Sequence, residues 1–190
     1  MLGFVFFPPS PRHLSLVSAR KLGARAAGRA TIVALTVDAD DATLADVIKA
    51  LTPDWLQLHG AETPERASAI RARFGLPVMK AIGVSTAADF KAIPRYKGVI
   101  DRVLLDAKPP KHATRPGGNA RPFDWTMISA EVIDIPWMLS GGLNPANVAE
   151  AIRVTDASAI DVSSGVESAP GVKDAGLIRA FVAKARAAAS

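Results

Sequence analysis

LSGGLNP at residues 139–145 is the stretch of sequence that decides the fold. It reads as the end of an apolar strand, a Gly-Gly turn and a helix start, with Asn144 as N-cap and Pro145 as the first helical residue. A second stretch, DVSSGVE at residues 161–167, follows the next expected strand. Glycine lets backbone N–H groups approach an anion, and a helix N-terminus favours negative charge. Either turn alone would read as a tight strand-to-helix connection, but two in succession predict a shared phosphate site.

Short apolar runs alternate with helical patterns along the rest of the chain. Seven strands are expected, at residues 2–7, 31–37, 55–59, 77–82, 102–105, 136–139 and 159–162. Seven helices are expected, at residues 15–27, 41–51, 64–74, 87–93, 125–133, 145–155 and 174–188. Thr63 and Pro64 supply an N-cap and a first helical proline for the third helix. The last helix places one apolar stripe on a single face, formed by Leu177, Ile178, Phe181, Val182 and Ala185.

The regular strand–helix alternation predicts an α/β fold with a parallel sheet. Most of the strands are apolar on both faces, which is typical of parallel strands covered on both sides. An open doubly wound sheet would carry G-x-G-x-x-G or G-x-x-x-x-G-K-[ST] after its first strand, and neither is present. The glycine turns instead follow the last two strands, where (β/α)8 TIM barrels bind phosphate. We expect one domain over residues 1–190 that belongs to the TIM-barrel class and contains seven of its eight βα units.

Composition excludes several classes of protein. The 190 residues are 49% hydrophobic and 22% charged, which is typical of a globular protein, and no apolar run is long enough for a membrane span. The net charge is +5, but the basic residues are scattered and aromatic residues make up only 6%, so no nucleic-acid partner is expected. Cysteine is absent, which fits a cytoplasmic protein without disulfides. His13 and His112 lack partners at metal-ligand spacing, so no metal is expected.

Four polar side chains lie at or shortly after the ends of expected strands and are candidates for chemistry. Asp106 ends one strand, and a carboxylate there reads as catalytic, although it could also cap a turn or hold a lysine. Asp161 could orient a substrate N–H group. His59 could contact substrate or could be a hydrogen-bonded structural histidine. Arg12 follows a stiff Ser-Pro pair that could aim its guanidinium at a carboxylate, and the alternative is a surface arginine.

Taken together, these motifs resemble the phosphoribosylanthranilate isomerase family of tryptophan biosynthesis. The matching segments follow the family's order and are GFVFFPPSPR (3–12), LQLHG (56–60), LLD (104–106), PGGNARPFDW (116–125), LSGGLNP (139–145), DVSSGVE (161–167) and PGVKD (170–174). The resemblance implies an Amadori rearrangement of phosphoribosylanthranilate to 1-(2-carboxyphenylamino)-1-deoxyribulose 5-phosphate, without a cofactor. It implies a small anionic phosphosugar as the binding partner, and a monomer or homodimer.

The resemblance also implies a role for each candidate residue. Asp106 matches the family's general acid, and Arg12 matches the arginine that holds the anthranilate carboxylate. His59 and Asp161 are expected to contact the substrate as well. The residues that match the phosphate-binding turns are Gly141, Gly142, Ser163, Ser164 and Gly165. The loop at residues 107–122 is long for a strand-to-helix connection, so we expect a lid there.

One departure from the family lies at the beginning of the chain. The family begins with a strand that ends in Lys-x-Cys-Gly, whose cysteine is the general base, whereas the first strand here matches the family's second. We therefore expect that the first βα unit, about 25 residues long at this chain's own spacing, precedes Met1 in the natural protein. Without the base, turnover should fall by roughly 10²–10⁴-fold. The alternatives are a non-catalytic phosphosugar-binding barrel and another phosphate-binding barrel enzyme.

Overall fold

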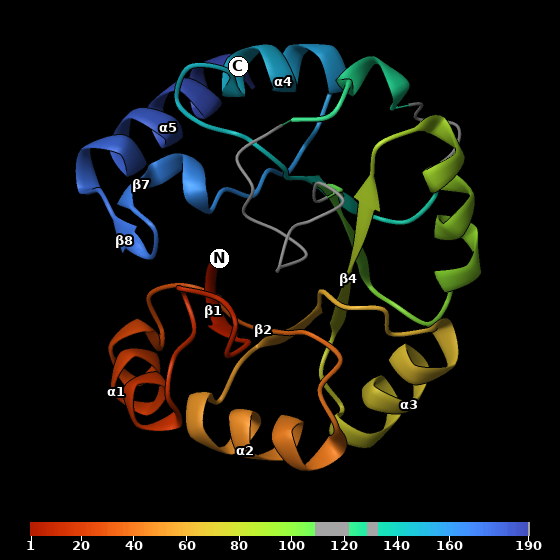
Figure 1. The fold of residues 1–190 in the computed structure, drawn as a ribbon, viewed down its shortest axis with the longest axis vertical. Helices are drawn as coiled ribbons and strands as arrows, with labels where there is room; N and C mark the ends of the chain where they lie inside the picture. The colour runs from red at the N-terminus through yellow and green to blue at the C-terminus, as the bar shows by residue number, and fades with distance from the viewer. Residues whose placement is uncertain (109–121, 129–132, 190) are drawn as a thin grey trace. The chain divides into compact units, whose positions relative to one another are not determined.

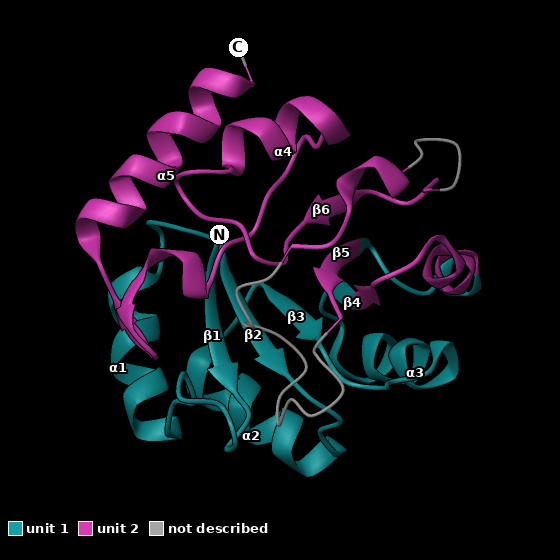
Figure 2. Ribbon diagram, turned by 45° about the horizontal axis from the view of Figure 1, so that its top comes forward, with its two compact units in different colours: residues 1–81, 95–102 teal, residues 82–94, 103–190 magenta. Residues whose placement is uncertain are grey.

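The computed structural model describes residues 1–108, 122–128 and 133–189, so most of the predicted lid lies outside the described residues. The described chain forms two compact units, coloured separately in Figure 2. Unit 1 contains residues 1–81 and 95–102, and unit 2 contains residues 82–94 and 103–190. One domain over residues 1–190 stays a prediction. Within the described ranges, no helix has both the length and the apolar character needed to cross a bilayer.

Six strands form a parallel sheet and alternate with helices along the chain. In sheet order they are β1 (Leu2–Phe6), β2 (Ile32–Thr36), β3 (Trp55–Leu58), β4 (Val78–Val84), β5 (Arg102–Ala107) and β6 (Trp137–Leu139). In unit 1 the register pairs Phe4 with Ala34 and Leu58 with Lys80. Each strand overlaps its predicted range, and the arrangement confirms the predicted α/β class with a parallel sheet.

The three helices of unit 1 follow their predicted bounds closely. They are α1 (Leu16–Ala26), α2 (Asp41–Leu51) and α3 (Pro64–Phe74), and Figure 1 shows them on one face of the unit 1 strands. Each helix begins where a side-chain oxygen accepts a hydrogen bond from a backbone N–H group two or three residues into the first turn. The capping residues are Ser15, Asp40 and Thr63, and the predicted proline of α3 stands in the first turn.

One predicted helix is a 3₁₀ segment instead, and another is described only in part. Residues 87–93 were expected to be helical and lie in η1 (Ala87–Tyr96), which contains Pro94. A proline inside an α-helix removes a donor and clashes with the preceding turn, so the longer-pitched 3₁₀ form replaces it here. The helix expected at 125–133 is described only as η2 (Trp125–Met127), with residues 129–132 outside the described part.

The helix after the Gly-Gly turn begins three residues later than predicted, as α4 (Val148–Thr155). Asn144 is not its N-cap, because the Asn144 side chain accepts a hydrogen bond from the backbone of Ala146 (2.7 Å) and shapes a turn. The N-cap is Asn147, whose Oδ1 accepts from the Asn144 backbone N–H (2.8 Å). Two asparagine side chains therefore extend the turn before the helix starts.

The strand predicted at 159–162 is reduced to a single bridge between Leu139 and Ile160. The Leu139 N–H donates to the Ala159 carbonyl (3.0 Å), and the Asp161 N–H donates to the Leu139 carbonyl (2.8 Å). Two residues after Leu139 the chain turns at Gly141, whose φ is +87°. Asp161 nevertheless stays beside the end of β6, where a seventh strand would have placed it.

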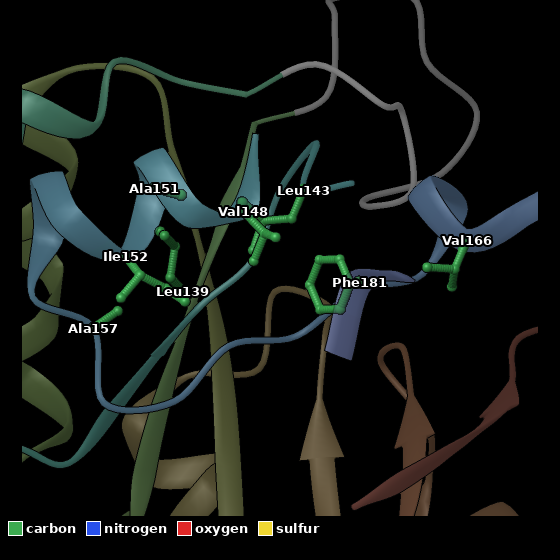
Figure 3. Close-up of a cluster of buried hydrophobic side chains, with 8 residues drawn as sticks. All are labelled: Leu139, Leu143, Val148, Ala151, Ile152, Ala157, Val166 and Phe181. Carbon is green, nitrogen blue, oxygen red and sulfur yellow. The ribbon is translucent and has the colours of Figure 1, made fainter. Parts of the chain in front are cut away.

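The core of unit 2 is a cluster of eight buried side chains around β6, α4 and α5 (Ala175–Ala188), drawn in Figure 3. They are Leu139, Leu143, Val148, Ala151, Ile152, Ala157, Val166 and Phe181. Of the predicted stripe on α5, Phe181 is buried and Ala185 packs partly against the cluster. Leu177, Ile178 and Val182 are each exposed by 36–40%, so the buried stripe is narrower than predicted.

The segment between Asp161 and α5 contains elements that the sequence analysis did not predict. It forms η3 (Ser164–Val166) and a two-stranded antiparallel hairpin of β7 (Glu167–Ala169) and β8 (Val172–Lys173). Asp174 then caps α5 by accepting a hydrogen bond from the Leu177 N–H (2.7 Å).

Candidate active site

The two glycine turns of unit 2 pack directly on each other. Gly165 lies so close to the turn after β6 that a Cβ at this position would stand 1.8 Å from the Leu143 carbonyl oxygen. Asn144 is also within 2.9 Å of that Cβ position. Only glycine fits at this position, because the lack of a side chain lets the backbones of the two turns come together.

The Gly-Gly turn also lies against the end of β5. A Cβ on Gly141 would stand 2.4 Å from the Ala107 backbone nitrogen, and its φ of +87° is in the region that glycine adopts without strain. The neighbouring Ser140 N–H donates to the Leu105 carbonyl (2.7 Å). The turn after β6 is therefore held next to the residue that follows Asp106.

Asp106 lies near the end of β5 and is only 5% exposed. Its Oδ1 accepts a hydrogen bond from the backbone N–H of Ala107 (2.9 Å), the same nitrogen against which Gly141 packs. The acid candidate and the first glycine turn thus share one backbone contact. A carboxyl group in this position can exchange a proton with a ligand bound at the turn.

The other polar candidates of unit 2 surround the same turns. Asp161 accepts a hydrogen bond from the Ser140 hydroxyl (3.1 Å), which links the residue before the Gly-Gly turn to the residue before the second turn. The Ser163 carbonyl and hydroxyl accept from the Lys173 ammonium at 2.7 and 3.4 Å. Lys173 in turn pairs with the carboxylate of Glu167 (2.8 Å). In unit 2 these contacts connect Asp106 with the turn after β6, and that turn with Asp161 and Gly165.

Two asparagine side chains after the Gly-Gly turn donate hydrogen bonds to its backbone. The Gly142 carbonyl accepts hydrogen bonds from the Asn147 amide (3.0 Å) and the Asn144 amide (3.4 Å). With its carbonyl held on that side, the peptide that joins Gly142 to Leu143 is fixed in direction. Asn147 was not predicted as a site residue, although its amide side chain three residues after Asn144 was a signal in the sequence.

Arg12 and His59 belong to unit 1. Arg12 is half-buried in the turn after β1, where its backbone N–H donates to the Ser10 hydroxyl (3.2 Å). His59 directly follows β3, and its Nδ1 lies 3.2 Å from the amide oxygen of Gln57. Its backbone N–H donates to the Thr36 carbonyl at the end of β2 (2.9 Å). Both residues thus follow the carboxyl ends of parallel strands.

Comparisons with known proteins agree with this architecture. The family model for N-(5'phosphoribosyl)anthranilate (PRA) isomerase matches residues 1–184. The N-(5'-phosphoribosyl)anthranilate isomerase of Nitrobacter winogradskyi is 64% identical over 188 residues, which are 99% of this chain and 84% of the relative. The chain belongs to the phosphoribosylanthranilate isomerase family.

Solved structures of the family superimpose on the chain. A crystal structure of monomers generated from the dimeric isomerase of Thermotoga maritima is 35% identical, with a TM-score of 0.81 over 97% of this chain and 86% of that one. A phosphoribosylanthranilate isomerase in complex with reduced 1-(o-carboxyphenylamino)-1-deoxyribulose 5-phosphate is 34% identical, with a TM-score of 0.82 over the same shares. These matches confirm the predicted family, the TIM-barrel class of fold, and the function as an isomerase of tryptophan biosynthesis. The roles of the individual site residues stay predictions.

Unit 1 of the isomerase contains a buried ion pair that was not predicted from the sequence. The Lys80 ammonium on β4 lies 3.1 Å from the Glu62 carboxylate, and the two side chains are only 3% and 2% exposed. Burial lowers the pKa of Lys80 from its usual value, and the nearby Glu62 carboxylate opposes part of this shift. A lysine inside the apolar run of β4 was the available signal, because a buried charge requires a partner.

A second missed pair lies in unit 2, close to Asp106 in sequence. Lys108 forms an ion pair with Asp89, whose other carboxylate oxygen accepts from the backbones of Ser85 (2.8 Å) and Thr86 (2.9 Å). Burial alone would raise the pKa of Asp89, but the hydrogen bonds from Lys108, Ser85 and Thr86 hold it well below its usual value. This pair fixes the chain two residues after the acid candidate.

A cavity of about 480 Å³ lies elsewhere, at the amino ends of β4 and β5 in unit 1. Its lining includes Pro77 and the ion pair of Arg71 with Asp101 (2.8 Å). In barrel enzymes the chemistry is at the carboxyl ends of the strands, so we assign this cavity no part in catalysis. Among the described residues, no three His, Asp or Glu side chains are grouped so that they could hold a metal ion.

Proposed function

We propose that this chain converts phosphoribosylanthranilate to 1-(2-carboxyphenylamino)-1-deoxyribulose 5-phosphate, with Asp106 as the general acid. One observation carries the proposal. Gly165 packs on the Gly-Gly turn, and Gly141 packs on the residue that follows Asp106. This contact chain supports an anion site made of backbone N–H groups beside a buried carboxyl group. A phosphorylated sugar bound there would present its ring to an acid.

In the proposed chemistry, two proton transfers lead to an enolamine. Asp106 donates a proton to the furanose ring oxygen, the C1–O bond breaks, and the ring opens to a Schiff base between C1 and the anthranilate nitrogen. A base then removes the proton from C2, which gives an enolamine that tautomerises to the ketone. The family's base is a cysteine, and these 190 residues contain none.

The remaining residues are proposed to hold the two anionic ends of the substrate. The phosphate would bind at the two glycine turns, through residues Gly141, Gly142, Ser163, Ser164 and Gly165. Asp161, fixed by the Ser140 hydroxyl, would accept a hydrogen bond from the substrate. Arg12 would bind the anthranilate carboxylate through its planar guanidinium, and His59 would contact the substrate from the end of β3.

The test is Asp106→Asn compared with Asp46→Asn, a matched control on the exposed face of α2. Asp106→Asn keeps the shape of the side chain but cannot donate a carboxyl proton, so turnover should fall by roughly 10²–10⁴-fold. Calorimetry should still detect binding of a reduced product analogue to both variants. Wild-type turnover by Asp106→Asn would refute its role as the acid.

The family comparisons do not favour a non-catalytic phosphosugar-binding protein or another barrel enzyme. A reduced product bound to one relative supports the phosphosugar as this chain's partner. Monomers have been generated from another, dimeric relative, so we propose a monomer or homodimer, which light scattering would distinguish. Membership in a biosynthetic family supports a cytoplasmic location.

A further inference from the structure

The buried pair of Glu62 and Lys80 is difficult to explain by stability alone. Both side chains are almost fully removed from solvent, with the ammonium nitrogen 3.1 Å from Oε2 of the carboxylate. Removing two charges from water costs several kcal/mol for each ion, and apolar residues of similar volume often replace such pairs without loss of stability. The pair therefore calls for an explanation in terms of what it holds in place.

The pair holds both peptide groups on either side of His59. The Lys80 ammonium donates to the carbonyls of Leu58 (3.3 Å) and Gly60 (2.7 Å), and also to that of Ala81. The Glu62 Oε2 accepts from the Gly60 N–H (2.9 Å). His59 lies between these contacts, so its backbone is fixed from both sides by the same ion pair.

The same carboxylate joins this segment to the loop after β2. The Glu62 Oε1 accepts from the Asp38 N–H (2.8 Å), and Asp38 accepts from the Ala61 N–H (2.7 Å). Asp38 has a φ of +49°, which is rare for a residue other than glycine and persists only where surrounding contacts enforce it. Gly60 lies against the Asp38 carboxylate, since a Cβ on Gly60 would stand 2.4 Å from it.

A third contact fixes the backbone of Glu62 itself. The Tyr96 hydroxyl at the end of η1 donates to the Glu62 carbonyl (2.8 Å). Three segments that are distant in sequence therefore contact Glu62: Asp38 and Lys80 at its carboxylate, and Tyr96 at its backbone carbonyl. The Lys80 nitrogen is surrounded by three carbonyl oxygens and this carboxylate, which suits a fixed ammonium rather than a reacting amine.

We infer that Glu62 and Lys80 are positioning residues that hold His59 and the loops after β2 and β3 in the substrate-binding geometry. This inference rests on the proposed contact between His59 and the substrate. Displacement of a positioned group by about 1 Å can cost on the order of 10²-fold in catalysis. Loss of the pair should therefore weaken binding and turnover by roughly 10- to 100-fold, even where the fold survives.

The experiment compares Lys80→Met and the double variant Glu62→Gln/Lys80→Met with wild type. The single variant leaves a buried carboxylate without its counter-ion and should lower Tm, whereas the double variant should recover part of that loss. The Kd for a reduced product analogue, measured by calorimetry, and kcat/KM should stay impaired in both. Recovery of Kd and kcat/KM together with Tm in the double variant would show a purely structural role and overturn the inference.

Two additions keep the result decisive. Ile70→Val, in the core of unit 1, serves as a control that lowers Tm without touching these loops, and it should leave Kd within about twofold. Tyr96→Phe removes one hydrogen bond to Glu62 and remains informative if Lys80→Met does not fold. The imidazole resonances of His59 should shift in Tyr96→Phe and Lys80→Met but not in Ile70→Val, and unchanged resonances would refute positioning.

The proposed substrate contact is tested separately by His59→Ala. If His59→Ala weakens analogue binding while the pair variants bind normally, the positioning role fails and the substrate contact stands. If His59→Ala binds normally while the imidazole resonances of His59 shift in the pair variants, the proposed contact fails instead.

Discussion

Gly165→Ala places a methyl group where a backbone oxygen already lies. The new Cβ would stand 1.8 Å from the Leu143 carbonyl oxygen, whereas real Cβ atoms essentially never approach closer than 3.0 Å. The two turns must therefore separate by about 1.2 Å along that contact. The opposing atom belongs to the backbone, so a side-chain rotation cannot relieve the clash. The proposed phosphate site should open.

The substitution should weaken both stability and binding. Overpacking of this kind costs roughly 1–3 kcal/mol, which corresponds to a Tm decrease of roughly 2–12 °C for a chain of this length. A displacement of about 1 Å in a positioned group can cost on the order of 10²-fold. We expect Kd for the reduced product analogue to rise by roughly 30- to 100-fold.

The measurement is calorimetric titration of wild type, Gly165→Ala and Gly3→Ala with the reduced product analogue. Gly3 lies in β1 with nothing within 4 Å of its Cβ position, so the same substitution there should leave Kd within about twofold. Circular dichroism confirms that each variant is folded at the titration temperature. A Gly165→Ala protein that binds as tightly as Gly3→Ala would refute the argument from turn packing.

Three further substitutions test other parts of the structure. Asp89→Asn should lower the free energy of unfolding, measured by urea titration, by about 1 kcal/mol at pH 7. The folded-state pKa of Asp89 lies below its ordinary value of 3.8, so its carboxylate stabilises the fold only where it is ionised. The difference from wild type should therefore fade as the pH falls below about 4. Phe181→Ala removes a side chain that is 4% exposed, and urea titration should give a loss of roughly 3–5 kcal/mol. Asn147→Ala leaves the Gly142 carbonyl with only the longer hydrogen bond from the Asn144 amide. Kd for the product analogue should rise by about fivefold, which corresponds to the loss of one hydrogen bond of ~1 kcal/mol. Unchanged affinity would exclude a supporting role for Asn147.

Elements with local signals were predictable from the sequence. α2 and α3 have the predicted bounds because Asp40 and Thr63 bond the first-turn N–H groups, and this interaction depends only on nearby residues. The start of α4 was not predictable in the same way. Asn144 has the chemistry of an N-cap, but its side chain bonds Ala146, and the Gly142 carbonyl engages Asn147. Which backbone group the Asn144 side chain binds depends on how the whole turn packs, and this cannot be read from neighbouring residues.

In the candidate site, too, features with local signals were predictable and features that depend on distant residues were not. The positions of Asp106 and of both glycine turns could be read from strand ends and turn residues. The packing of Gly165 on the Leu143 carbonyl depends on residues that are distant in sequence, as does the bond between Ser140 and Asp161. The pairing of Glu62 with Lys80 likewise needs the register of β3 with β4, in which Leu58 stands opposite Lys80.

The division into two units has a consequence for recombination between isomerase genes. Unit 1 takes its last residues, 95–102, from beyond a stretch of unit 2, so the chain passes between the units three times. A single crossover therefore cannot exchange one unit intact. A junction after residue 81 leaves 95–102 with the other parent, and a junction after residue 102 transfers 82–94 along with unit 1. Chimeric isomerases built from two parents will need matched residues in β4 and η1, whichever single junction is chosen.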